Sequence, residues 1–143
     1  MEWVETAIRV RYQETDKMGV VYHANYFVWF EVSRTEMVRQ LGVDYRKLEE
    51  IGLYLPVIDV NCQYKVSAKY DDEIIIRSRI IEYSRLRLTM EYEVIRKEDH
   101  QLLATGKTKH VWLDKDYRPV RLDRFAPLIH QRLLEKLDLL PRL

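Results

Sequence analysis

Residues 13–30 read QETDKMGVVYHANYFVWF, and the change of character within this stretch decides the fold. Its first half is a polar loop that holds two carboxylates, Glu14 and Asp16, with a glycine and a histidine behind them. Its second half begins a helix expected over residues 24–41, where Glu31 is the only charge in the first part. A helix that is apolar nearly all round belongs in a core rather than on a surface. We therefore expect a buried central helix that follows directly on a polar loop.

Around this helix the apolar residues alternate with polar ones, which predicts half-buried strands. Strands are expected over residues 3–13, 58–66, 73–83, 86–94 and 102–113, and further helices over residues 44–52 and 126–140. Strands grouped in this way favour an α+β class with an antiparallel sheet, which can curl around one buried helix. Ala104, Gly106 and Thr108 make one face of the last strand small, so a helix can approach it closely.

The composition is typical of a globular protein with one domain over residues 1–143. The apolar fraction is 47%, the charged fraction is 33%, and a net charge of +1 argues against nucleic acid as a partner. The lone Cys62 cannot form an intrachain disulfide, which fits a reducing compartment. The first ten residues carry charges within any apolar run, so we expect neither a signal peptide nor a membrane span, and a cytoplasmic location.

The pattern ETDKMGVVYHANYFVWFEVSRTEM, residues 14–37, resembles the motif of the hotdog-fold acyl-CoA thioesterases. It is most similar to the 4-hydroxybenzoyl-CoA thioesterase-like branch, which includes the bacterial thioesterases encoded with the Tol-Pal envelope system. The resemblance extends over about residues 5–135 and implies a curved antiparallel sheet of about five strands wrapped around one long helix, plus a C-terminal helix. It also implies an enzyme that hydrolyses the thioester of a small acyl- or aryl-CoA to the free acid and CoA.

By this resemblance Asp16 lies at the catalytic position, as the nucleophile or as the general base toward water. The alternative is that Asp16 only caps its loop, which is a common role of aspartate in turns. The N-terminus of a helix exposes unpaired N–H groups, so the backbone at His23 and Ala24 is expected to polarise the carbonyl and stabilise the oxyanion. The His23 side chain could orient Asp16, donate to the carbonyl or bond the backbone. Tyr22 is a further catalytic candidate with a structural role as its alternative.

The resemblance further implies that Ser84, Arg85 and Arg87, just before the fourth strand, contact the phosphates of CoA. A solvated, charged strand end is the alternative for each of them. CoA enters only as part of the substrate and product, and no other cofactor is expected. No metal is expected either, because the four histidines, at positions 23, 100, 110 and 130, lack paired ligand spacing.

Relatives of this kind form homodimers or homotetramers, as dimers of dimers, and assemble their active sites between subunits. The resemblance implies the same assembly here, and the sequence by itself shows only that a sheet of this size leaves long edges, which proteins pair or cover. Two other functions compete with the thioesterase. One is a non-catalytic hotdog module that binds and senses acyl-CoA, and the other is a hotdog dehydratase or hydratase, whose chemistry calls for a different Asp/His arrangement. The sequence leaves the acyl specificity open.

Overall fold

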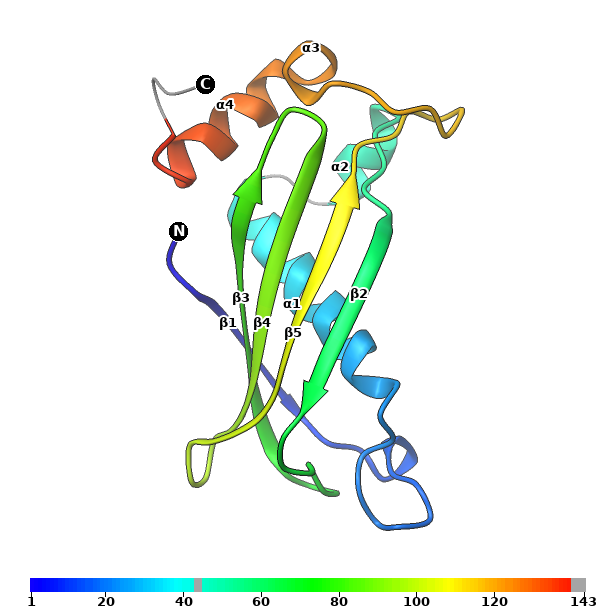
Figure 1. Ribbon diagram of the computed structural model, residues 1–143, viewed down its shortest axis with the longest axis vertical. Coiled ribbons are helices and arrows are strands. Elements are labelled where there is room, and N and C mark those ends of the chain that lie inside the picture. The colour runs from blue at the N-terminus through cyan, green and yellow to red at the C-terminus, as the bar shows by residue number, and fades with distance from the viewer. Residues whose placement is uncertain (43–44, 140–143) are drawn as a thin grey trace.

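Five antiparallel strands and four α-helices make up the part of the chain that the structure, a computed structural model, describes, namely residues 1–42 and 45–139 (Figure 1). The strands are β1 (Val4–Arg9), β2 (Val57–Tyr64), β3 (Glu73–Tyr83), β4 (Arg87–Arg96) and β5 (Gln101–Val111), and the helices are α1 (Asn25–Gln40), α2 (Tyr45–Glu50), α3 (Leu122–Phe125) and α4 (Pro127–Lys136). The spatial order β1-β3-β4-β5-β2 places β1 and β2 at the edges. The predicted α+β class with a five-stranded antiparallel sheet is confirmed.

The central strands follow the alternation of their apolar residues. In β3, Ile74, Ile76 and Ile80 are buried in the core, whereas Arg77 and Arg79 between them are half-buried on the opposite face. Successive side chains of a strand point to opposite faces, so this pattern fixes which face of the sheet receives the helix. The hairpins between β3 and β4 and between β4 and β5 pair these strands over most of their length.

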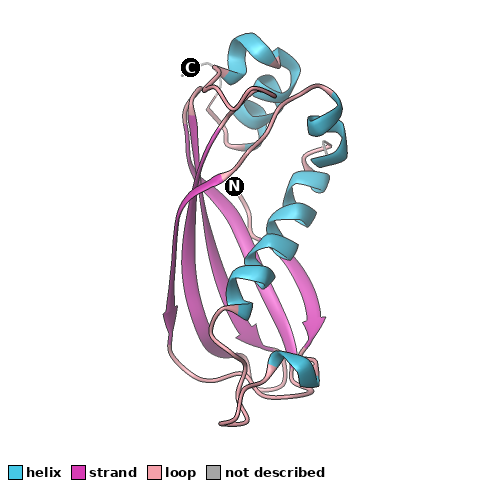
Figure 2. Cartoon of the chain, turned by 90° about the vertical axis from the view of Figure 1, so that its right-hand side faces the viewer, coloured by secondary structure: helices cyan, strands magenta, loops and turns pink. Residues whose placement is uncertain are grey.

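The long helix α1 lies along the concave face of the sheet, as Figure 2 shows. Trp29, Phe30 and Met37 are its most deeply buried large side chains. Phe30 stacks on Tyr92 of β4 with ring centroids 4.4 Å apart. A Cβ atom at Gly106 of β5 would lie 2.5 Å from the Phe30 ring, so the small face of β5 accommodates an aromatic side chain of α1.

One prediction about α1 is wrong for the single chain. The helix is not buried all round, because Phe27, Val28 and Val32 are 36%, 51% and 40% exposed. The sheet covers only one side of the helix, and none of the described residues covers these three. The edge strand β2 is likewise exposed on both faces, including its apolar Ile58 and Val60. The surface of the protomer therefore carries apolar side chains on both α1 and β2.

Several element boundaries also differ from the prediction, and two of the differences have a clear structural cause. The first strand ends at Arg9 rather than at residue 13, because the amide of Arg11 donates to the Glu14 carboxylate at 2.8 Å and closes the 3-10 turn η1 (Tyr12–Glu14). The expected C-terminal helix is divided into α3 and α4, with Pro127 at the first position of α4. Residues 44 and 140, the predicted ends of two helices, lie outside the described residues. No described helix has the length and apolar character needed to cross a membrane.

Candidate active site

The polar loop before α1 folds back on itself as a narrow hairpin. The amide of Tyr22 donates to the Glu14 carbonyl at 2.8 Å, and the amide of Asp16 donates to the Val20 carbonyl at 2.9 Å. Gly19 has a φ of +78°, a left-handed conformation that glycine adopts without strain. These bonds hold the carboxylate of residue 16 and the start of α1 within one short, closed loop.

Asp16 is half-buried in this loop. Its Oδ1 accepts a hydrogen bond from the amide of Met18 at 2.8 Å. The structural role considered for Asp16 is therefore present, since one oxygen braces the turn. Its Oδ2 accepts no hydrogen bond from the residues that the structure describes. A carboxylate oriented through one oxygen keeps the other as a base or nucleophile, so the two roles of Asp16 are compatible.

Glu14 anchors this loop, a role that sequence reasoning missed. Its side chain is buried, with Oε1 accepting from the Arg11 amide at 2.8 Å and Oε2 accepting from the Trp29 indole N–H at 2.9 Å. Its backbone carbonyl accepts from the Asn25 side-chain amide at 2.8 Å, which ties the loop to the first residue of α1. No local signal reveals the bond to Trp29, because the two residues are fifteen positions apart and only the fold brings them together.

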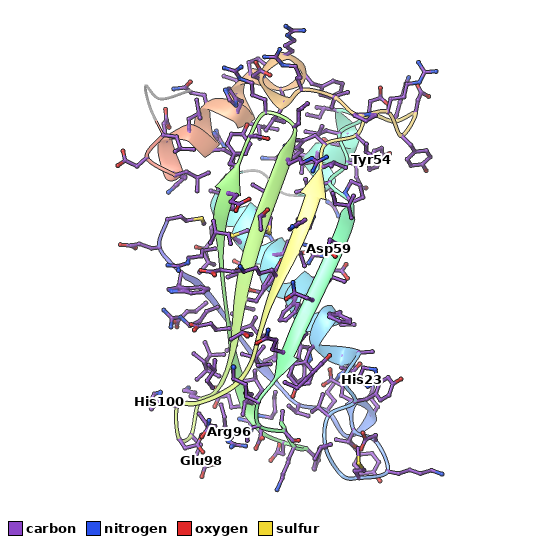
Figure 3. The ribbon with its side chains drawn as sticks, viewed as in Figure 1. His23, Tyr54, Asp59, Arg96, Glu98 and His100 are labelled. Atoms are coloured by element: carbon purple, nitrogen blue, oxygen red, sulfur yellow. The ribbon has the colours of Figure 1, made fainter. Side chains whose placement is uncertain are left out.

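The N-terminus of α1 offers two amide groups beside the loop. Within the described ranges the N–H groups of His23 and Ala24 donate no hydrogen bond, whereas the amide of Asn25 donates to the Tyr22 carbonyl at 3.0 Å. These amides lie at the positive end of the helix dipole. The Tyr64 hydroxyl donates to the His23 carbonyl at 2.8 Å and ties the helix start to the end of β2, near the His23 label in Figure 3. Burial raises the pKa of Tyr64 to about 12, which keeps this donor protonated.

The side chains of His23 and Tyr22 are both exposed. Their ring centroids lie 4.4 Å apart, and the His23 ring also meets the edge of Tyr64 at 6.4 Å. No hydrogen bond joins the His23 imidazole to Asp16 among the described side chains. The catalytic roles of both rings stay predictions, and the backbone is the part of His23 that the geometry favours.

The structure does not bring Ser84, Arg85 and Arg87 together with Asp16 inside one chain. They lie at the tip of the β3–β4 hairpin, and β3 extends away from that tip for eleven residues, or about 35 Å at 3.3 Å per residue. Ser84 Oγ accepts from the amide of Arg87 at 3.1 Å, and the Arg85 guanidinium pairs with Asp123 at 3.4 Å. Two of the three thus have structural roles, and the contact with CoA stays a prediction.

Near this hairpin tip lies a cavity of about 280 Å³, lined in part by Ser84, Arg87 and Lys109. The described residues contain no group of three or more His, Cys, Asp or Glu side chains that could hold a metal ion. Cys62, on β2, is partly buried and packs against the core, and burial raises the pKa of its thiol. A raised pKa disfavours the thiolate, so Cys62 does not resemble an activated nucleophile.

Comparison with known proteins places these observations in a family. The model of the Thioesterase-like superfamily matches residues 10–137. YneP of Bacillus subtilis is 35% identical over 124 residues, which cover 86% of this chain and 89% of that protein. The acyl-CoA thioesterase YbgC of Haemophilus influenzae is 36% identical over 109 residues, or 76% of this chain and 80% of that protein. The crystal structure of a DHNA-CoA thioesterase from Staphylococcus aureus is 39% identical with a TM-score of 0.93, and the match covers 97% of this chain and 93% of that one.

Proposed function

Because this chain belongs to the Thioesterase-like superfamily, whose similar members include acyl-CoA thioesterases, we propose that it hydrolyses the thioester of a small acyl- or aryl-CoA to the free acid and CoA. The observation that carries this proposal is the loop that holds the Asp16 carboxylate beside the unbonded amides of His23 and Ala24. A base or nucleophile and a pair of oxyanion donors are the two groups that acyl transfer from sulfur requires.

The reaction needs one proton acceptor and one oxyanion site. As a general base, Asp16 takes a proton from water while the water oxygen bonds to the thioester carbon. The carbonyl oxygen becomes an oxyanion, which the amides of His23 and Ala24 stabilise. Collapse of this intermediate breaks the carbon–sulfur bond, and the thiolate of CoA takes the proton from Asp16. As a nucleophile, the Asp16 carboxylate instead attacks the thioester carbon and expels the thiolate of CoA, which leaves a mixed acyl anhydride. Water then cleaves the anhydride to the free acid and the Asp16 carboxylate, and the proton released goes to the thiolate; the same oxyanion site serves both steps.

The surface of the protomer supports assembly into at least a homodimer. The edge strand β2 exposes Val57, Ile58 and Val60 at 41%, 51% and 40%, and α1 exposes Phe27 and Val28. Unpaired strand edges with apolar side chains are a ready template for a second strand. An antiparallel pair of β2 strands would join two sheets edge to edge. It would also invert the partner, so that its β3–β4 hairpin tip lies at the end of the molecule that holds Asp16.

Asp16→Asn tests the catalytic assignment. The amide keeps an oxygen that can accept from the Met18 amide but cannot take a proton, so we expect turnover to fall by about 10²–10⁴-fold, the range of general acid–base catalysis. Release of free thiol from a panel of acyl- and aryl-CoA esters measures the rate, and thermal unfolding checks the fold.

The same experiment separates the enzyme from a module that only senses acyl-CoA. A sensor would bind the esters without releasing thiol, in the wild type as in the variant. An Asp16→Asn protein that folds and still hydrolyses at the wild-type rate would contradict the role of Asp16. Lys17→Gln, at the exposed residue next to Asp16 in the same loop, is the matched control and should retain activity.

A further inference from the structure

A groove of about 550 Å³ lies between α2 and the α3–α4 segment, at the end of the molecule opposite the polar loop (Figure 1). Its volume falls within the range of small-molecule sites in proteins. Apolar side chains form most of its walls, and three of them, Ile51, Phe125 and Leu128, are 51%, 39% and 80% exposed. A ligand with an apolar body would remove this surface from water, which is favourable.

The packing of α4 does not account for Leu128. The helix is held on the rest of the chain by Leu133 and Leu134, which are both 3% exposed. Leu128 belongs to the same helix but lines the groove, where the described residues leave it mostly uncovered. A contiguous exposed apolar surface marks a place where another molecule binds more often than a single exposed leucine does.

The charged side chains of the lining are both cationic. Lys47 of α2 and Arg132 of α4 line the groove, and none of the described residues around it is acidic, so one lysine and one arginine give the lining a formal charge of +2. The whole chain, in contrast, has a net charge of only +1, because its acidic and basic residues nearly balance. Apolar walls with this charge are complementary to an amphipathic anion.

The Arg132 guanidinium is fixed in place just beyond the C-terminus of α1. Its Nη1 donates to the Gly42 carbonyl at 2.8 Å. Gly42 has a φ of +84°, and a Cβ atom at this residue would collide with the guanidinium, so glycine leaves the space that Arg132 occupies. Among the described residues no carboxylate pairs with Arg132, and no acceptor bonds to its Nε or Nη2. An anchored cation therefore keeps donors for a ligand.

A carboxylate matches these donors. The Nε and Nη2 groups of a guanidinium lie side by side and can bind both oxygens of one carboxylate, while Lys47 adds a second positive charge without a fixed geometry. The other described residues of the lining contribute no polar side chain. A second polar group on the ligand would lose its hydration there without a partner, so a plain hydrocarbon chain suits the rest of the groove.

The groove is separate from the proposed catalytic loop. Gly42 follows α1, whose 16 residues extend about 24 Å from the His23 end at 1.5 Å per residue. None of the described lining residues belongs to α1 or to β2. The exposed apolar side chains of α1 and β2 that suit a second copy are therefore not part of the groove, and mutations can change binding in the groove without changing hydrolysis.

We propose that this groove binds the anion of a fatty acid, with its carboxylate on Arg132 and its hydrocarbon chain along Ile51, Phe125 and Leu128. The site lies beyond the hydrolysis proposed above and does not depend on it.

Calorimetric titration with decanoate, decan-1-ol and butyrate tests the recognition. Decan-1-ol lacks the charge and butyrate lacks most of the chain, so each should bind at least about tenfold more weakly than decanoate. Arg132→Met should raise the Kd of decanoate by about tenfold or more, because hydrogen bonds to a charged group are lost. Arg132→Lys keeps the charge and should lose less. Arg124→Met removes a cation from α3 outside the lining and, as the control, should bind like the wild type.

Leu128→Ser tests the apolar part of the site at an exposed residue, where the core is not disturbed. It should raise the Kd of decanoate by about fourfold or more, the effect of one or more methylene groups that the ligand no longer covers. Release of thiol from acyl-CoA esters should proceed at the wild-type rate in both Leu128→Ser and Arg132→Met.

Photolabelling locates the bound chain. Decanoate with a diazirine at the end of its chain is irradiated with the wild-type protein, which is then digested with trypsin and analysed by mass spectrometry. Cleavage after Arg124 and Arg132 releases residues 125–132 as one peptide, and this peptide should carry the label unless unlabelled decanoate is present in excess. Label confined to the tryptic peptide of residues 18–34 would place the ligand beside Asp16 and overturn the proposal.

Three further results would overturn it. One is a wild type that binds decanoate no more tightly than decan-1-ol, and another is an Arg132→Met protein that binds decanoate like the wild type. The third is a smaller particle for Leu128→Ser than for the wild type in sedimentation, which would make the groove an interface between copies of the chain.

Discussion

Glu14 shows how one buried carboxylate can position the loop that carries Asp16, the proposed catalytic residue. It connects the Arg11 amide, the Trp29 indole and, through its carbonyl, the Asn25 side chain. The loop that carries Asp16 is thereby bonded to the helix whose N-terminus offers the proposed oxyanion donors. A catalytic group must be held close to its productive geometry by its supporting residues, so the position of Asp16 depends on Glu14.

Glu14→Ala should therefore destabilise the protein and slow it. The change leaves the indole N–H of Trp29 buried without its acceptor, which costs about 1–3 kcal/mol in the free energy of unfolding. Urea denaturation measures this loss. Glu14→Gln keeps one acceptor oxygen and should lose less, while both variants should show a lower kcat. Equal stability of Glu14→Ala and the wild type would show that the two hydrogen bonds do not anchor the loop.

The proposed site residues that the sequence indicates lie close together along the chain. Asp16, His23 and Ala24 fall in one recognisable stretch, and the structure brings them into one loop. The roles of Glu14 and Tyr64 were not predicted. Their hydrogen-bond partners, Trp29 and His23, are far away in sequence, and a hydrogen bond at that separation has no local signature.

Gly106 illustrates how β5 and α1 determine each other. The strand has no side chain at the point where the Phe30 ring meets it, and the ring in turn stacks on Tyr92. Periodicity predicted both elements and also the small face of the strand. It did not predict that α1 is covered on only one side, because the pattern of a helix records which residues are apolar and not which surface is available to cover them.

Gly106→Ala should cost about 1–3 kcal/mol in the free energy of unfolding, since the added methyl lies 2.5 Å from two atoms of the Phe30 ring and 2.8 Å from the Asn61 carbonyl. Chemical denaturation of Gly106→Ala, Phe30→Leu and the double variant measures the coupling. Phe30→Leu shortens the side chain that the added methyl would contact. The sum of the stability losses of the two single variants should therefore exceed the loss measured for the double variant. Strict additivity would show that the ring is not what excludes the methyl.

The uncovered apolar side chains of α1 and β2 and the buried polar chain behind Arg34 belong to one arrangement of the molecule. The apolar side chains face outward, while the polar chain runs inside the core from Arg34 through Tyr92, Thr108 and His110 to the Leu55 carbonyl. Buried polar groups are costly unless each has a partner, so the chain from Arg34 to Leu55 is stable only while His110 is neutral. The stability of the whole fold is thereby coupled to one histidine.

His110 is fully buried, and burial lowers its pKa from the usual 6.5 to about 4. As the pH falls below 6.5, the unfolded chain takes up a proton at this residue and the folded chain does not. The stabilisation is therefore complete above about pH 6.5 and is lost progressively as the pH falls toward 4. The loss should amount to about 2 kcal/mol between pH 7 and pH 4.5.

Urea denaturation of the wild type and of His110→Asn at these two pH values measures this contribution. Carboxylates titrate in both proteins, so the difference between their two losses belongs to His110. The variant should be less stable than the wild type at pH 7, because the hydrogen bonds to Thr108 and Leu55 are weakened, yet it should lose less on acidification. Parallel losses in the two proteins would mean that His110 is protonated in the folded state above pH 4.5, which a fully paired chain of neutral donors and acceptors does not allow.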